Sequence, residues 1–220
     1  MFSRKTLVAD LLFWVQVVLA FLLSVPQFFR LLENVKGQSL SMQVVMLGFL
    51  LLNLSLALGA YRVEPNRNTL QIIAIYIMWA VFVTGNIVAI FWNGLYCWSS
   101  NDTVTMFLVG AGVVSILNIC MIKGLGLKEA SIKGSLAIIF KALPQFMMAL
   151  KIASEGGAGI PMMTIIVGNI GVTIRIGQLL VAIKKIGWDK NLTWIFLAEV
   201  ANEISWVIVT MAWFYWFLFL

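Results

Sequence analysis

Seven long apolar segments follow one another along the chain, separated by short stretches that hold most of the turn-forming residues. Each segment is long enough to cross about 30 Å of hydrocarbon as a helix, which takes about 20 residues. The apolar runs are continuous and do not alternate with polar residues, so they predict helices and not strands. The predicted spans are residues 7–32, 40–61, 69–92, 103–122, 132–152, 160–183 and 192–218.

The composition agrees with a membrane protein. Of the 220 residues, 62% are hydrophobic and 11% are charged, whereas soluble domains have roughly 45–50% and about 25%. The absence of His and the wide separation of the two cysteines exclude a His-based metal site, a His general base and a Cys cluster. Because no nucleophile–base pair or metal set is visible, we expect no enzymatic activity, no metal and no cofactor.

Lysine and arginine are distributed unevenly between the two sides of the predicted bundle. One side holds ten of the fifteen: Arg4, Lys5, Arg62, Arg67, Lys123, Lys128, Lys133, Lys184, Lys185 and Lys190. The other side holds Arg30, Lys36 and Lys151. The positive-inside rule therefore predicts a multi-pass protein with a cytoplasmic N-terminus and the C-terminus outside. We attribute the net charge of +6 to this orientation and expect no nucleic-acid partner. Short tails and the lack of disulfide-rich loops favour a bacterial inner membrane.

A Pro–Gln–Phe motif occurs twice, at Pro26-Gln27 in the first span and at Pro144-Gln145 in the fifth. A polar loop with Gly follows each motif. The repeat divides the chain into three helices (1–95), a linker helix (96–127) and three helices (128–220). One linker helix between two three-helix units gives both units the same orientation. The predicted fold is thus an all-α membrane protein with seven transmembrane helices, built as two parallel three-helix repeats plus a linker helix.

This duplicated intramembrane doublet in a 3+1+3 layout resembles the PQ-loop superfamily, which includes the SWEET sugar transporters, lysosomal amino-acid exporters and the KDEL receptor. The resemblance covers nearly the whole chain in layout, and at residue level it rests on the two doublets and Pro161, where SWEET proteins also carry a proline. It implies a central pocket between two three-helix bundles and alternating access. Plant and animal SWEETs place the N-terminus outside, so the orientation expected here departs from theirs.

The doublets themselves suggest hinges. A proline within a helix deletes one backbone hydrogen bond and clashes with the carbonyl one turn earlier. In lipid the freed carbonyl needs a partner inside the protein, and Gln27 and Gln145 could supply one or bond a neighbouring helix. Pro26 and Pro144 are therefore either hinges, which the repeat favours, or static kinks.

The seventh span carries an informative stripe, because Glu199, Asn202, Glu203 and Trp206 fall on one helical face. Carboxylates within a span must face the interior, pair or protonate. Two interpretations remain open. In the first, Lys141 and the two glutamates, with Arg175 of the sixth span, form a structural salt-bridge network. In the second, the stripe residues Glu199, Asn202, Glu203 and Trp206, together with Arg175, line a polar cavity that binds a solute and contains a protonatable Glu, with Glu203 as the preferred candidate.

The third span offers Trp79 and Asn86 as further candidates for solute binding. The resemblance implies one pocket asparagine from the third span and one from the seventh, for which Asn86 and Asn202 are the candidates. It also implies a pocket residue about fourteen positions after Pro161, where this chain has Arg175. An arginine there favours an anionic or zwitterionic solute over a neutral sugar.

Together these features predict a transporter that moves a small polar metabolite (a sugar, an amino acid or an organic acid) between two PQ-loop bundles by alternating access. The alternative is a seven-helix ligand-binding receptor or sorting protein of the KDEL-receptor type. The expected partners are the solute and the lipid bilayer. The sequence does not decide whether protons are coupled or whether the chain forms a homo-oligomer.

Overall fold

The computed structural model describes residues 4–127 and 129–219, with side chains for all of these except 4–9, 185 and 186. The fold is 86% helical, and the described residues contain no strand. Seven helical segments are long and apolar enough to cross a membrane, and each overlaps one predicted span. The prediction of a multi-pass, all-helical membrane protein is therefore confirmed.

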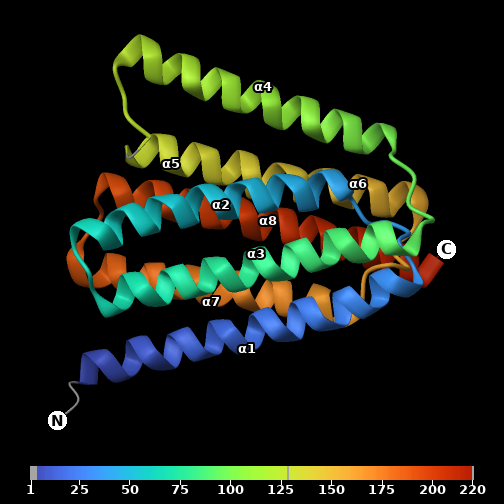
Figure 1. Ribbon diagram of the computed structural model, residues 1–220, viewed down its shortest axis with the longest axis horizontal. Helices are drawn as coiled ribbons and strands as arrows, with labels where there is room; N and C mark the ends of the chain where they lie inside the picture. The colour runs from blue at the N-terminus through green and yellow to red at the C-terminus, as the bar shows by residue number, and fades with distance from the viewer. Residues whose placement is uncertain (1–3, 128, 220) are drawn as a thin grey trace.

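Six spans are single helices and the fifth is composite (Figure 1). The single helices are α1 (Arg4–Glu33), α2 (Leu40–Val63), α3 (Arg67–Asn93), α4 (Ser100–Lys123), α7 (Met162–Ile186) and α8 (Lys190–Phe219). The fifth span consists of α5 (Ala130–Ala137), the π-helical turn η1 (Ile138–Ala142) and α6 (Leu143–Glu155). Because the number of crossings is odd, the two ends of the chain lie at opposite ends of the bundle (Figure 1).

Local sequence explains where the helices begin. The side chains of Ser39, Asn66 and Ser99 accept hydrogen bonds from the first-turn N–H groups of α2, α3 and α4, as residues at N-caps commonly do. At α4 the Ser99 and Asp102 side chains bond each other's backbone N–H groups, forming a capping box. Each cap lies in a short polar stretch, so the same residues that interrupt the apolar pattern also start the next helix.

The helices pack in two sets. In the first, α3 lies between α1 and α2; in the second, α8 lies between the fifth span and α7. We call α1–α3 the first half and α5–α8 the second half. The halves meet through α1 against α7 and α2 against α6, while α4 lies on one flank against α2, α5 and α6 (Figure 1).

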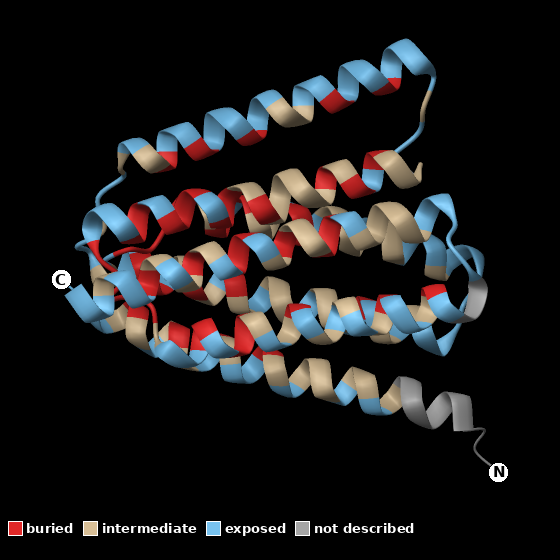
Figure 2. Ribbon diagram, turned by 180° about the vertical axis from the view of Figure 1, so that it is seen from behind, coloured by how far each residue is buried: buried red, intermediate tan, exposed pale blue. Residues whose placement is uncertain are grey.

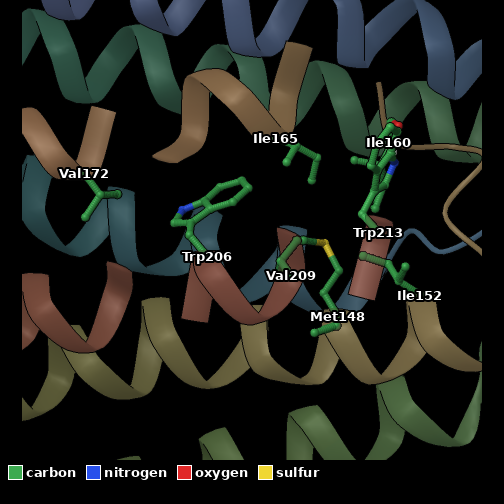
Figure 3. Packing of buried hydrophobic residues seen from close by; sticks show 9 residues of the cluster. Met148, Ile152, Ile160, Ile165, Val172, Trp206, Val209 and Trp213 are labelled. Carbon is green, nitrogen blue, oxygen red and sulfur yellow. Dashed lines mark hydrogen bonds between the residues drawn. The ribbon is translucent and has the colours of Figure 1, made fainter. Parts of the chain in front are cut away.

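A hydrophobic core fills the space between α6, α7 and α8 (Figure 3). It includes Met148, Ile165 and Val209 together with two tryptophans. Trp206 packs so closely on α7 that a Cβ at Gly168 would lie 2.7 Å from its ring. Trp206, predicted as a solute-binding residue, therefore lies in the core of the second half and packs against a glycine there.

The two ends of the bundle differ in burial. We call them the C-terminal end, with loops 34–39, 94–99 and 156–161, and the N-terminal end, with loops 64–66, 124–127 and 187–189. At the C-terminal end, residues 37–41 and most of 156–160 are buried, whereas most of the 94–99 loop is exposed (Figure 2). At the N-terminal end, residues 64–66 and 187–189 are exposed. The chain is thus more tightly closed at the C-terminal end.

Candidate functional site

An ion pair connects the fifth span with α8. Lys141 Nζ lies 3.0 Å from Glu199 Oε1, and the two side chains are 23% and 12% exposed. The lysine ammonium also lies over the ring of Phe49 on α2, 5.7 Å from its centroid. Phe49 in turn stacks on Phe140 of the same π turn. The pair is therefore placed where the first half meets the second, and we call it the ionic centre.

The position of Lys141 follows from local backbone geometry. It lies in η1, where the N–H of Leu143 donates to the carbonyl of Ile138, five residues earlier. The next residue, Pro144, has no N–H to offer the preceding turn. Such π turns inside α-helices often occur at functional sites. Here the wide turn carries the cation of the ionic centre.

Asn202 extends the ionic centre along α8. Its Nδ2 donates to Glu199 Oε2 at 3.4 Å, and because a carboxylate at neutral pH only accepts hydrogen bonds, this contact fixes the orientation of the amide. The Asn202 Oδ1 atom is buried and has no hydrogen-bond partner among the described residues. An unpaired buried acceptor of this kind is uncommon and requires an explanation.

Glu203 lies apart from the ionic centre. Its Oε1 accepts a hydrogen bond from Thr173 Oγ1 of α7 at 3.2 Å, and its Oε2 is buried without a partner. Arg175 is exposed and its Nη1 donates to Gln178 at 3.4 Å. Among the described residues, neither Glu203 nor Arg175 forms an ion pair. Of the four-residue salt-bridge network, one of the two interpretations left open by the sequence, only the Lys141–Glu199 pair is present among the described residues.

Trp79, a candidate on the third span, is half-buried and packs edge-on against Phe82 of its own helix. Phe82 in turn contacts Phe21 of α1. These contacts join Trp79 to the packing between α3 and α1.

Asn86 is buried and, like Asn202, has a side-chain oxygen without a partner among the described residues. The two asparagines form no hydrogen bond with each other. Their shared feature is the unpaired buried oxygen, which leaves both able to accept a hydrogen bond from a solute or a water molecule.

The two Pro–Gln motifs make different contacts. Gln27 Nε2 donates to the carbonyl of Gly159 at 3.0 Å, across the two halves. Gln145 instead accepts a hydrogen bond from Ser205 within the second half. Pro26 lies inside the unbroken helix α1, and Pro144 follows the π turn. These contacts are compatible with a hinge and with a static kink, so the hinge role of the prolines stays a prediction.

The loops at the C-terminal end interlock. The N–H of Gly159 donates to the carbonyl of Lys36 at 2.9 Å, and Arg30 Nε donates to the carbonyl of Ala158 at 2.7 Å. Gly37 has a φ of +76°, and a Cβ at this position would lie 2.1 Å from the carbonyl oxygen of Gly156. Glycine is therefore required where the two loops cross, and these bonds hold the halves together at this end.

A second buried ion pair, which the sequence analysis did not find, lies beside these loops. Lys151 Nζ is 2.8 Å from Asp102 Oδ2, and the two side chains are 1% and 0% exposed. Asp102 also accepts hydrogen bonds from the hydroxyls of Ser39, Ser41 and Tyr96. Burial and the bond to Asp102 both raise the pKa of the Tyr96 phenol, so it remains a protonated donor. The pair connects α2, α4 and α6.

The sequence marks only one residue of this pair, Asp102. A Ser followed three residues later by an acidic residue just before an apolar run, as at Ser99 and Asp102, indicates a helix cap. The charge distribution assigns Lys151 to the same side as Arg30 and Lys36, and nothing in the sequence connects it with a carboxylate 49 positions earlier. In the structure Lys151 is buried in the bundle, where it is paired with Asp102.

Two hollows, of about 440 and 360 Å³, are lined by α2 alone and by α2 with α3. None of the predicted site residues lines either hollow. The described residues also contain no group of three or more His, Cys, Asp or Glu side chains that could hold a metal ion. No family model, no curated protein and no solved structure matches this chain.

Proposed function

We propose that the protein transports a small polar solute across the membrane by alternating access, with two parallel three-helix repeats moving about the ionic centre. The observation that carries this proposal is the Lys141–Glu199 pair, which is partly buried at the contact between the halves and lies near the midpoint of the 26-residue fifth span. Charged groups at such depth are costly and occur mostly where a membrane protein handles a solute or an ion.

The unequal ends of the bundle support alternating access. Hydrogen bonds from Gln27 and Arg30 to the 156–161 loop close the C-terminal end. In this proposal, the present conformation is the one closed at the C-terminal end. Breaking these bonds while the halves tilt would open that end, and the packing of α3 and α8 each between two neighbours would let each half move as a unit.

The ionic centre also favours a class of solute. Removing one partner of this partly buried pair leaves an unpaired charge, which costs about 1–3 kcal/mol. A zwitterion could insert between Lys141 and Glu199 and satisfy both charges, whereas a simple anion or cation would leave one of them unpaired. The free Oδ1 of Asn202 beside Glu199 would accept a further hydrogen bond from the ammonium group of such a solute. Neutral polar solutes that leave the pair intact are the remaining candidates.

Glu203 is the carboxylate best placed for proton coupling, since it has no cationic partner among the described residues. If it takes up a proton during transport, Glu203→Gln keeps the fold but loses the pH dependence of flux. If it is structural, the same variant lowers the melting temperature and the residual flux keeps the wild-type pH profile. Thr173→Val is the matched control, because it removes the hydrogen bond to Glu203 and leaves the carboxylate.

The direct test is uptake by proteoliposomes of radiolabelled amino acids, sugars and organic acids, each compared with protein-free liposomes. We expect saturable uptake of a zwitterionic solute, and its loss in Lys141→Met. Binding of a solute without any flux would contradict the proposal and favour a receptor or sorting protein. Neither binding nor flux for any member of the panel would contradict both.

A further inference from the structure

A surface hollow runs along one exposed side of α2. The larger hollow is lined by Leu51, Leu54, Ser55, Leu58, Gly59 and Arg62. These residues recur at intervals of three and four, so they form one stripe along the helix. At 3.6 residues per turn this stripe lies on the opposite side of α2 from Phe49 and the ionic centre. The hollow therefore belongs to a surface that the proposed transport site does not use.

The second hollow continues the first. Both are lined by Leu51 and Leu54, and the second adds Leu47 and four residues of α3: Ile77, Ala80, Val81 and Thr84. We call the two hollows together the α2–α3 groove. Ser55 and Arg62 make one end of the groove polar, and the lining of the other end is aliphatic apart from Thr84. A ligand that fits this distribution has a polar head and a long apolar tail.

The positive charge of Arg62 at the polar end of the groove favours a ligand with an anionic headgroup. Arg62 lies in the last turn of α2, is exposed, and forms no ion pair with any described residue. It belongs to the end of the bundle that carries most of the Lys and Arg residues. Basic side chains at the membrane surface and between transmembrane helices attract anionic lipid headgroups.

The dimensions of the groove agree with a lipid in one leaflet. Arg62 lies fifteen positions after Leu47, the first residue of the groove, and at 1.5 Å per residue this is about 22 Å. One leaflet with its headgroup region is about 20–22 Å thick. A headgroup at Arg62 would therefore lie at the membrane surface while its acyl chain follows the groove towards the bilayer centre.

We propose that the α2–α3 groove binds one anionic phospholipid, with Arg62 on the phosphate and one acyl chain between α2 and α3. The site is independent of the transported solute. The test is native mass spectrometry of the purified full chain, titrated with phosphatidylglycerol and with phosphatidylcholine of the same acyl chains. Wild-type protein should retain phosphatidylglycerol in preference to phosphatidylcholine.

Two variants test the contact with the headgroup and the space for the acyl chain separately. Arg62→Gln should weaken phosphatidylglycerol binding about fivefold, the effect of one basic residue near a membrane surface, and leave phosphatidylcholine binding unchanged. Gly59→Leu should weaken binding of both lipids, because a Cβ at Gly59 projects into open space in the groove, with no atom within 4 Å. Leucine has a higher helix propensity than glycine, so this variant should keep the fold, which its melting temperature verifies.

Matched controls exist for both variants. Gly48 lies on the same helix, its Cβ would also meet no atom within 4 Å, and it lines neither hollow, so Gly48→Leu should not change lipid binding. Lys123→Gln removes an exposed basic residue from the last turn of α4 and should have less effect than Arg62→Gln. Equal wild-type retention of the two lipids would overturn the proposal. Variants that behave like their controls would overturn it as well.

Discussion

The two Pro–Gln helices share a motif and use it differently. The first, α1, remains one continuous α-helix through Pro26, and its Gln27 donates to Gly159 in the other half of the molecule. The fifth span contains a π turn just before Pro144, and its Gln145 accepts a hydrogen bond from Ser205 in its own half. One motif thus joins the halves, and the other adjusts the interior of one half.

The difference extends to charge. The fifth span carries two buried or half-buried lysines, Lys141 in the ionic centre and Lys151 beside Asp102. The basic residue of α1 near its motif, Arg30, pairs with Glu33 at the surface, where both side chains are well exposed. A repeated dipeptide therefore does not carry a repeated electrostatic role, because the neighbouring residues decide what the local backbone positions.

The largest expected effect is at Lys151. Lys151→Met leaves the fully buried Asp102 without its cation, which should lower the free energy of unfolding by about 3–5 kcal/mol. The control is Arg67→Met, because the Arg67–Asp10 pair is 58% and 26% exposed and should contribute at most about 1 kcal/mol. Thermal and chemical unfolding in detergent measure both. Equal losses for the two variants would mean that the buried pair is not a stabilising contact between α4 and α6.

The next effect is at Lys141. Lys141→Met should abolish flux and cost about 1–3 kcal/mol of stability, since Glu199 is left unpaired in a partly buried position. The double variant Lys141→Met/Glu199→Gln should recover most of the stability and none of the flux, because the unpaired charge is gone but the binding groups are too. Recovery of flux in the double variant would make the ionic centre a purely structural pair.

A smaller effect distinguishes the two glutamines. Gln27→Ala and Gln145→Ala should each lose about 1 kcal/mol, the usual net contribution of one hydrogen bond. Of these two variants, only Gln27→Ala should speed amide hydrogen exchange in residues 156–161, because Gln27 bonds that loop and Gln145 does not. If both variants raise exchange in this loop equally, the contrast between a bond across the halves and a bond within one half is lost.

The smallest effect on stability is expected for the prolines, below about 1 kcal/mol for each replacement by Ala. Pro144→Ala supplies an N–H that could close an α-helical bond to the preceding turn and remove the π turn, which would withdraw Lys141 from Glu199. Flux should therefore slow more in Pro144→Ala than in Pro26→Ala. Flux measured side by side in proteoliposomes tests this order, and a greater slowing in Pro26→Ala would reverse the assignment.

The stripe of polar residues on α8 shows which features of the site the sequence could predict and which it could not. Its spacing predicted that Glu199 and Asn202 share a buried face, and both are buried. It did not predict that Glu199 forms an ion pair with Lys141, or that Glu203 accepts a hydrogen bond from Thr173. Helical periodicity fixes which residues share a face, but partners on other helices depend on how the helices rotate and slide against one another.

The sequence by itself determined the number of spans, their positions and the all-helical class, because continuous apolar runs of this length are satisfied in lipid only as helices. It also marked Lys141 and Glu199 as groups that must find partners. The tertiary structure alone decided the Asp102–Lys151 pair, the crossing of the loops at Gly37 and the π turn before Pro144. These features arise where segments distant in the chain meet, and the free energy of such contacts depends on three-dimensional packing that no local pattern encodes.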